Sequence, residues 1–117
     1  MKARELKAHC DRLCAEHEIT WLPGRLPLAL RVTREILTPP IRGPVSYAWV
    51  LHEIGHILGR YQNSRRCMVR ETWAWTWARH HTLCWTPAME RSRQAGLDWY
   101  RARAAGIDAK WQPEVVP

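Results

Sequence analysis

The chain has 117 residues, which is enough for one domain with a single hydrophobic core. A hydrophobic fraction of 46% and a charged fraction of 25% exclude a disordered protein, and no apolar run approaches the roughly 18–20 residues of a membrane span. The net charge of +7 comes mainly from arginines scattered along the chain, which favours a solvated basic surface over a nucleic-acid site. The N-terminal residues are charged and form no apolar signal core, so we expect a cytoplasmic protein without a membrane partner.

Helical or alternating spacing of apolar residues, interrupted by proline and glycine, predicts a small α+β domain that is mainly helical. Gly59 is expected to close a helix in the left-handed conformation, and Gly96 to interrupt the last helix, which would resume at Asp98. The predicted order is a helix at 2–17, a strand at 19–22, one strand or a two-stranded hairpin at 28–38, and helices at 46–58, at 69–83 and from 86 onward. A short sheet of two or three strands therefore precedes the helix at 46–58.

The four cysteines form no CxxC pair, so reduced thiols are expected rather than disulfides. Cys10, Cys14 and His17, with His9 beside them, share one helix face and could hold a second metal ion. Structural zinc sites usually draw ligands from two separate segments, however, so burial of these cysteines in the core is the favoured interpretation.

The segment His52-Glu53-Ile54-Gly55-His56 carries the strongest chemical signal. Residues four apart lie on one helix face, so His52 and His56 can direct their imidazoles at a single zinc ion while Glu53 accepts a proton from its bound water. In this composition chance predicts roughly 0.02 such patterns, which argues against the alternative of two core-edge histidines with a solvated Glu53. Gly55 costs about 0.5–1 kcal/mol within a helix and so indicates close approach by a second element.

A catalytic zinc site needs a third protein ligand. The extended metzincin pattern would place a histidine at position 62, but Gln62 is a neutral amide and a poor ligand. His80 and His81 are adjacent on a helix, so at most one could face the ion. Glu71 is the predicted ligand, because a loop and a returning helix can span the fifteen residues from His56. The alternative for Glu71 is an exposed acid in a first helical turn.

The two motifs together carry a resemblance to a known family. The stretch Leu51-His-Glu-Ile-Gly-His-Ile-Leu58, followed by Glu71-x-x-Ala74-x-x-Trp77-Ala78, resembles the ImmA/IrrE-type metallopeptidase domain, a gluzincin family. The similarity covers residues 28–78, includes Thr38-Pro39-Pro40 before the first motif helix, and departs from the family at Trp75, where asparagine is usual. It implies a minimal zincin-like fold, one Zn²⁺ and peptide hydrolysis. Similar family members often occur on phages and mobile elements, where some act on repressor proteins.

The domain interpretation follows from this resemblance. Residues 1–117 are predicted to form one metallopeptidase-like domain with its core at about 28–84, a basic helical region at 86–105 and a loose tail at 106–117.

We therefore expect a zinc-dependent endopeptidase in which His52, His56 and Glu71 hold one Zn²⁺ and Glu53 is the general base. Its expected partner is a protein or peptide substrate, which could be a regulatory protein. One alternative is a zinc-stabilised protein-binding regulator without catalysis. Another is a basic nucleic-acid-binding protein, suggested by the arginine excess and by eight tryptophans that could stack on bases. A second donor to the oxyanion is not assigned, although the side chains of Tyr47, Tyr61, His80 and His81 have suitable chemistry.

Overall fold

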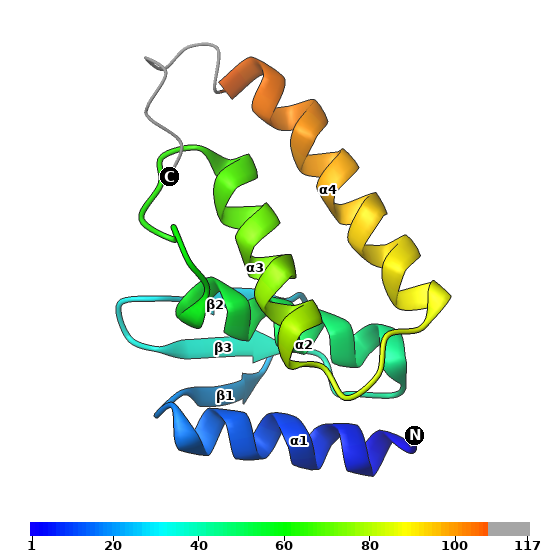
Figure 1. Ribbon diagram of the computed structural model, residues 1–117. Coiled ribbons are helices and arrows are strands. Elements are labelled where there is room, and N and C mark those ends of the chain that lie inside the picture. Colours follow the sequence, from blue (N-terminus) through cyan, green and yellow to red (C-terminus); the bar gives the residue numbers. More distant parts are fainter. Residues whose placement is uncertain (108–117) are drawn as a thin grey trace.

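The computed structural model describes residues 1–107 and has four helices and a three-stranded sheet, as Figure 1 shows, so the α+β prediction is confirmed. The elements are α1 (Ala3–Glu16), β1 (Thr20–Pro23), β2 (Leu28–Leu30), β3 (Glu35–Thr38), α2 (Pro44–Leu58), α3 (Cys67–His81) and α4 (Pro87–Ile107). Within this described part, no helix is both long and apolar enough to cross a bilayer. Residues 106 and 107 belong to α4, and the rest of the tail expected at 106–117 lies outside the described residues.

The segment at 28–38 forms two strands joined in a hairpin, which decides between the two alternatives for this region. β3 is the central strand, parallel to β1 and antiparallel to β2. In the hairpin Leu28 pairs with Leu37 and Leu30 pairs with Glu35, and the turn contains Arg34 at a φ of 56°. Among the described residues β2 pairs only with β3, so it is an edge strand.

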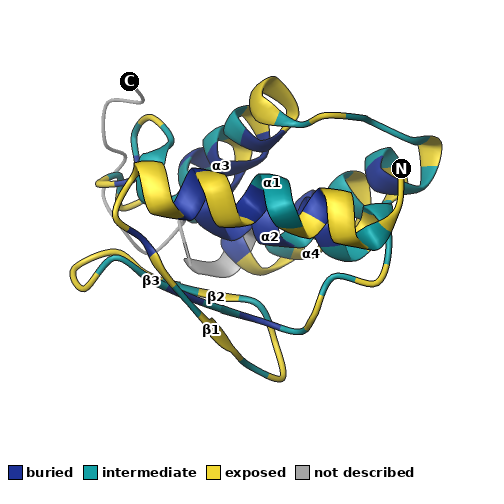
Figure 2. Ribbon diagram, turned by 90° about the horizontal axis from the view of Figure 1, so that it is seen from below, coloured by how far each residue is buried: buried dark blue, intermediate teal, exposed yellow. Residues whose placement is uncertain are grey.

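The core lies around α2, where α1 and α3 pack against it, and Figure 2 shows the buried segments of these helices concentrated there. α2 is the central helix and contacts α1, the sheet, α3 and α4. Cys10 and Cys14 project from α1 into this core as free thiols. Burial, with the nearby charge of Asp11, raises the pKa of Cys14 to about 11, so the thiol stays protonated at neutral pH.

Gly55 is where α2 and α3 touch most closely. A β-carbon at this position would lie 3.0 Å from the carbonyl carbon of Ala74 and closer still to the carbonyl oxygen, which is well inside van der Waals contact. The close approach that the sequence indicated for Gly55 is therefore made by α3, the helix that carries Glu71.

We expect Gly55→Ala to destabilise the fold by about 1–3 kcal/mol, because the added methyl group must push α3 away from α2. Alanine has the higher helix propensity, by about 0.5–1 kcal/mol, so a loss of stability would report the clash itself. Urea unfolding measures the effect. Gly43→Ser is the control, since a β-carbon there meets nothing within 4 Å and serine is a good N-cap residue. If Gly55→Ala and Gly43→Ser had equal free energies of unfolding, close packing of α3 against Gly55 would be contradicted.

Two glycine predictions were wrong, and both for reasons of tertiary packing. Gly59 follows α2 in extended backbone (φ −69°, ψ 163°), not in the left-handed conformation, which Tyr61 adopts instead with a φ of 60°. Gly96 does not interrupt α4, which is continuous through that position. A β-carbon on Gly96 would lie 3.3 Å from the Trp49 ring, so glycine lets α4 approach α2.

Candidate metal centre

Helix α2 places His52 and His56 one turn apart on the face that meets α3. Their ring centroids lie 4.6 Å apart, and His52 is buried while His56 is partly exposed. The His52 ring is held between two tryptophans: it stacks on Trp75 at a centroid distance of 4.3 Å and meets the edge of Trp49 at 5.2 Å. Trp75 thus forms part of the wall that orients the first histidine.

Helix α3 brings Glu71 against both histidines. One carboxylate oxygen lies 3.1 Å from His52 Nε2 and the other lies 2.6 Å from His56 Nε2. Glu71 is only 5% exposed, so the alternative of a solvated acid in the first turn of this helix is wrong. The three predicted ligands therefore lie together, with one donor atom from each within 4.8 Å of the others, and this group could hold a metal ion.

The charges of this cluster are strongly coupled. Burial alone would lower the pKa of His52, but its hydrogen bonds to Glu53 and Glu71 and their charges outweigh burial and raise the pKa to about 9. Burial alone would raise the pKa of Glu71, but hydrogen bonds from the two histidines and their charges lower it to about 2. The carboxylate is thus ionised, and protons bridge it to the rings. A cation can replace those protons, because metal ligands bind in their deprotonated forms.

Gln62 supports the second histidine from the loop after α2. Its side-chain nitrogen donates to the carbonyl oxygens of Arg60 (3.2 Å) and Arg70 (2.9 Å), which turns its side-chain oxygen toward His56 Nδ1 at 2.9 Å. An amide oxygen only accepts, so His56 must donate from Nδ1. Nε2 is then the nitrogen that could bind a metal, in place of the proton that it shares with Glu71. The prediction that Gln62 is not a ligand agrees with this arrangement, but its role in orienting His56 was not predicted from the sequence.

Replacing Gln62 by alanine is expected to weaken zinc binding by about 10–100-fold, because His56 loses the acceptor that fixes its tautomer and orientation. Competition with a chromophoric chelator measures the affinity. Asn63→Ala truncates the neighbouring amide, which is exposed, and should leave the affinity unchanged. A similar loss in both variants would mean that the loop as a whole, rather than the Gln62 side chain, supports the site.

Glu53 lies beside the three ligands and remains outside the group that they form. Its side chain is only 5% exposed, and its Oε2 accepts a hydrogen bond from His52 Nδ1 at 3.2 Å. Glu53 also lines the cleft above the cluster, where a carboxylate could exchange a proton with a bound water.

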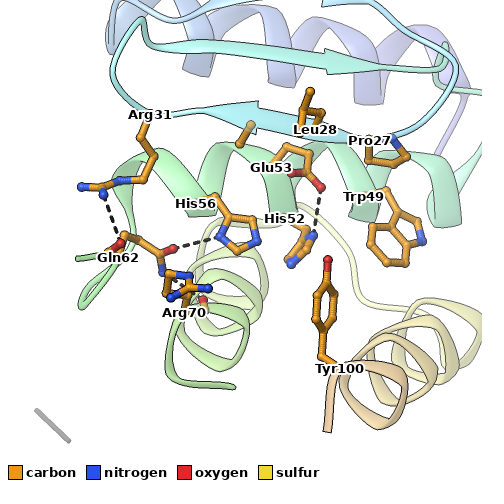
Figure 3. A pocket seen from close by; sticks show the side chains of 11 residues that line it. Pro27, Leu28, Arg31, Trp49, His52, Glu53, His56, Gln62, Arg70 and Tyr100 are labelled. Atoms are coloured by element: carbon orange, nitrogen blue, oxygen red, sulfur yellow. Dashed lines mark hydrogen bonds and ion pairs between the residues drawn. The ribbon is translucent and has the colours of Figure 1, made fainter. Parts of the chain in front are cut away.

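A cleft of about 290 Å³ opens over His52, Glu53 and His56. Figure 3 shows Tyr100 of α4 pointing its hydroxyl into this cleft, toward His52 and Glu53. Burial, followed by the charges of Glu71 and Glu53, raises the pKa of Tyr100, so the phenol keeps its proton and can donate it in a hydrogen bond. Sequence reasoning did not consider Tyr100.

The other side chains considered for the site lie elsewhere. His80 and His81 are exposed and line a separate surface hollow with Trp73 and Trp77, so neither is the third ligand. Tyr47 is buried and contacts His9, and Tyr61 packs against the edge of Trp73. Among the described residues no second group of three His, Cys, Asp or Glu side chains converges, so a second site at Cys10, Cys14 and His17 is not formed.

Comparison of the chain with protein-family models finds no matching family, and comparisons with curated proteins and with solved structures also find no match. The chemistry of the site must therefore be argued from its own geometry.

Proposed function

We propose that this chain is a zinc-dependent endopeptidase related to the ImmA/IrrE-type gluzincins. The observation that carries the proposal is the convergence of His52, His56 and Glu71 beneath a cleft that a second carboxylate, Glu53, lines without joining the ligand group. Two imidazoles and one carboxylate form a donor set that suits Zn²⁺ and leaves a coordination position open to water. The bound ion would polarise the peptide carbonyl and lower the pKa of the attacking water.

The proton transfers fall to Glu53. Its carboxylate takes the proton from the attacking water and later delivers it to the leaving amine, so that one group acts first as base and then as acid. The orienting contacts of the site keep the ligands in place during this exchange: Gln62 holds the His56 ring, and Trp75 covers the His52 ring.

Edge strand β2 supports a peptide as the substrate. Ala29 and the neighbouring Leu28 line the cleft, and β2 pairs on one side only within the described chain. An extended peptide could add to the free edge through main-chain hydrogen bonds, which would carry its scissile bond past the histidines.

Tyr100 is the proposed second donor to the oxyanion that forms during attack. Tyr100→Phe is expected to lower kcat by about 10²–10³-fold with little change in KM, since the hydrogen bond is needed in the transition state rather than in the ground state. Steady-state kinetics on a cleaved peptide, with zinc content measured in parallel, test this. Tyr61→Phe removes a hydroxyl from a tyrosine outside the cleft and should be neutral. A rise in KM alone would assign Tyr100 to substrate binding instead.

The overall proposal is tested by incubating zinc-loaded protein with a complex peptide mixture and identifying new termini by mass spectrometry. We expect cleavage that stops when a chelator removes the zinc and returns when zinc is restored. A protein with stoichiometric zinc that cleaves nothing would contradict catalysis and favour the non-catalytic regulator. A protein that takes up no zinc would contradict both.

A further inference from the structure

Two arginines line one end of the cleft. Arg31 directly follows edge strand β2, and Arg70 lies in the first turn of α3, immediately before Glu71. Figure 3 shows both on the Gln62 side of His56, while Trp49 and Pro27 lie beyond Glu53 on the opposite side. We call the Arg31 and Arg70 side the arginine end. The cleft is therefore basic at one end and apolar at the other.

Neutral groups hold both guanidinium groups. Arg31 Nη1 donates to the Gln62 carbonyl oxygen at 3.0 Å, and Arg70 Nη1 donates to the Ser64 carbonyl oxygen at 2.5 Å. Carbonyl oxygens fix the orientation of a guanidinium but do not neutralise its charge. Each group has further N–H donors beyond the one used in these contacts. The arginine end is thus oriented and keeps its positive charge.

No carboxylate within the described residues forms an ion pair with Arg31 or Arg70. The two acids nearest to them in the site, Glu53 and Glu71, contact the histidines instead. With a divalent cation bound, those two carboxylates would balance the ion, and the two guanidinium charges would stay uncompensated. Two like charges lining one small cleft repel each other unless an anion lies between or beside them.

We propose that the arginine end binds a carboxylate of the substrate, on the side of the scissile bond next to His56. This inference rests on the proposed peptidase function and narrows its substrate class. Guanidinium groups recognise carboxylates through paired, charge-assisted hydrogen bonds, so the ligand is either an Asp or Glu side chain or the free C-terminus of a peptide. Trp49, Pro27 and Leu28 at the other end would accept an apolar side chain.

The test uses four versions of a peptide that the wild type cleaves. They carry Glu or Gln at one position near the scissile bond, and each is made with a free or an amidated C-terminus. The expected preference for the version with the right carboxylate is about tenfold in kcat/KM. Between the two peptides with an amidated C-terminus, a preference for Glu over Gln identifies the side chain. Between the two peptides with Gln, a preference for the free C-terminus identifies the terminal carboxylate.

Arg31→Gln/Arg70→Gln should reduce this preference to less than about twofold. Arg4→Gln/Arg91→Gln removes the same charge from exposed positions outside the cleft and should retain the preference. Zinc content is measured in every variant, because Arg70 adjoins Glu71. Equal rates for all four peptides, or a preference that survives in the Arg31/Arg70 variant, would overturn the inference while leaving the peptidase proposal intact.

If the zinc-loaded wild type cleaves no peptide, a peptide of one arbitrary extended sequence is made in the same four forms, with Glu or Gln and a free or amidated C-terminus, and their binding is compared by calorimetry. A carboxylate preference that depends on Arg31 and Arg70 would then support the arginine end as a binding site and reject catalysis. Absence of both cleavage and preference would reject both proposals.

Discussion

Glu71→Gln is expected to yield a folded protein that loses zinc affinity by more than the roughly 10–100-fold expected for loss of an orienting partner such as Gln62. Glu71 supplies the carboxylate that faces Nε2 of both histidines, at 3.1 and 2.6 Å. Glutamine has nearly the same shape but is a neutral amide, which binds zinc far more weakly than a carboxylate does. Chelator competition measures the affinity, and far-ultraviolet circular dichroism checks the fold.

Glu5→Gln provides the matched control for this prediction. It removes the same charge from an exposed position on α1 and should bind zinc as the wild type does. If Glu71→Gln also retained wild-type affinity, the third ligand would have to be another group, and the predicted His-His-Glu site would be wrong.

Glu53→Gln, in contrast to Glu71→Gln, is expected to keep its full zinc content and to lose about 10²–10⁴-fold in kcat. The amide oxygen of glutamine can still accept a hydrogen bond from His52 Nδ1, which Glu53 accepts at 3.2 Å, so the ligand geometry should survive. What glutamine cannot do is take a proton from water. Metal analysis and peptide kinetics on the same preparation separate the two effects.

The zinc content of Glu53→Gln, compared with that of Glu71→Gln, distinguishes a role in proton transfer from a role in metal binding. Loss of zinc in Glu53→Gln would mean that Glu53 stabilises the site rather than acting as a base. Undiminished cleavage by a zinc-loaded Glu53→Gln protein would remove the proposed mechanism, since no other carboxylate of the described chain lines the cleft.

Local geometry explains why the ligand cluster could be predicted from the sequence. The spacing of His52 and His56 requires only a helix, and residues four apart on a helix lie on one face. The link to Glu71 required one long-range inference, namely that a loop and a returning helix span the fifteen residues from His56. Gly55 indicated separately that a second element comes close to α2. The contact between Gly55 and Ala74 joins the two ligand-bearing helices.

The two site residues that were not predicted, Gln62 and Tyr100, take their roles from loop conformation and from the packing of one helix on another. Gln62 was judged as a ligand, whereas its role comes from a loop conformation in which two carbonyl oxygens orient its amide. Tyr100 was not considered, and its position depends on α4 continuing through Gly96, where a break was expected. By helix geometry, a continuous α4 rises about 20 Å from Pro87 to Tyr100, and α3 rises about 15 Å from Glu71 to His81. Because α4 runs back alongside α3, these similar rises place Tyr100 near the level of Glu71 along the two helices.

The two glycine errors have the same origin. Gly59 and Gly96 were judged by backbone preference, which favours left-handed caps and helix breaks. In the fold both lie where another helix leaves little space, since a β-carbon would meet the Trp73 carbonyl oxygen at 3.1 Å in the first position and the Trp49 ring at 3.3 Å in the second. Space of this kind depends on which elements pack together, which the sequence alone does not specify.

The position of the metal is tested most directly by anomalous diffraction at the zinc edge, from crystals grown with zinc. We predict one strong peak within about 2.0–2.2 Å of Nε2 of His52, Nε2 of His56 and a carboxylate oxygen of Glu71. A peak at other side chains, or no peak in zinc-saturated crystals, would contradict the metal centre on which the proposed function depends.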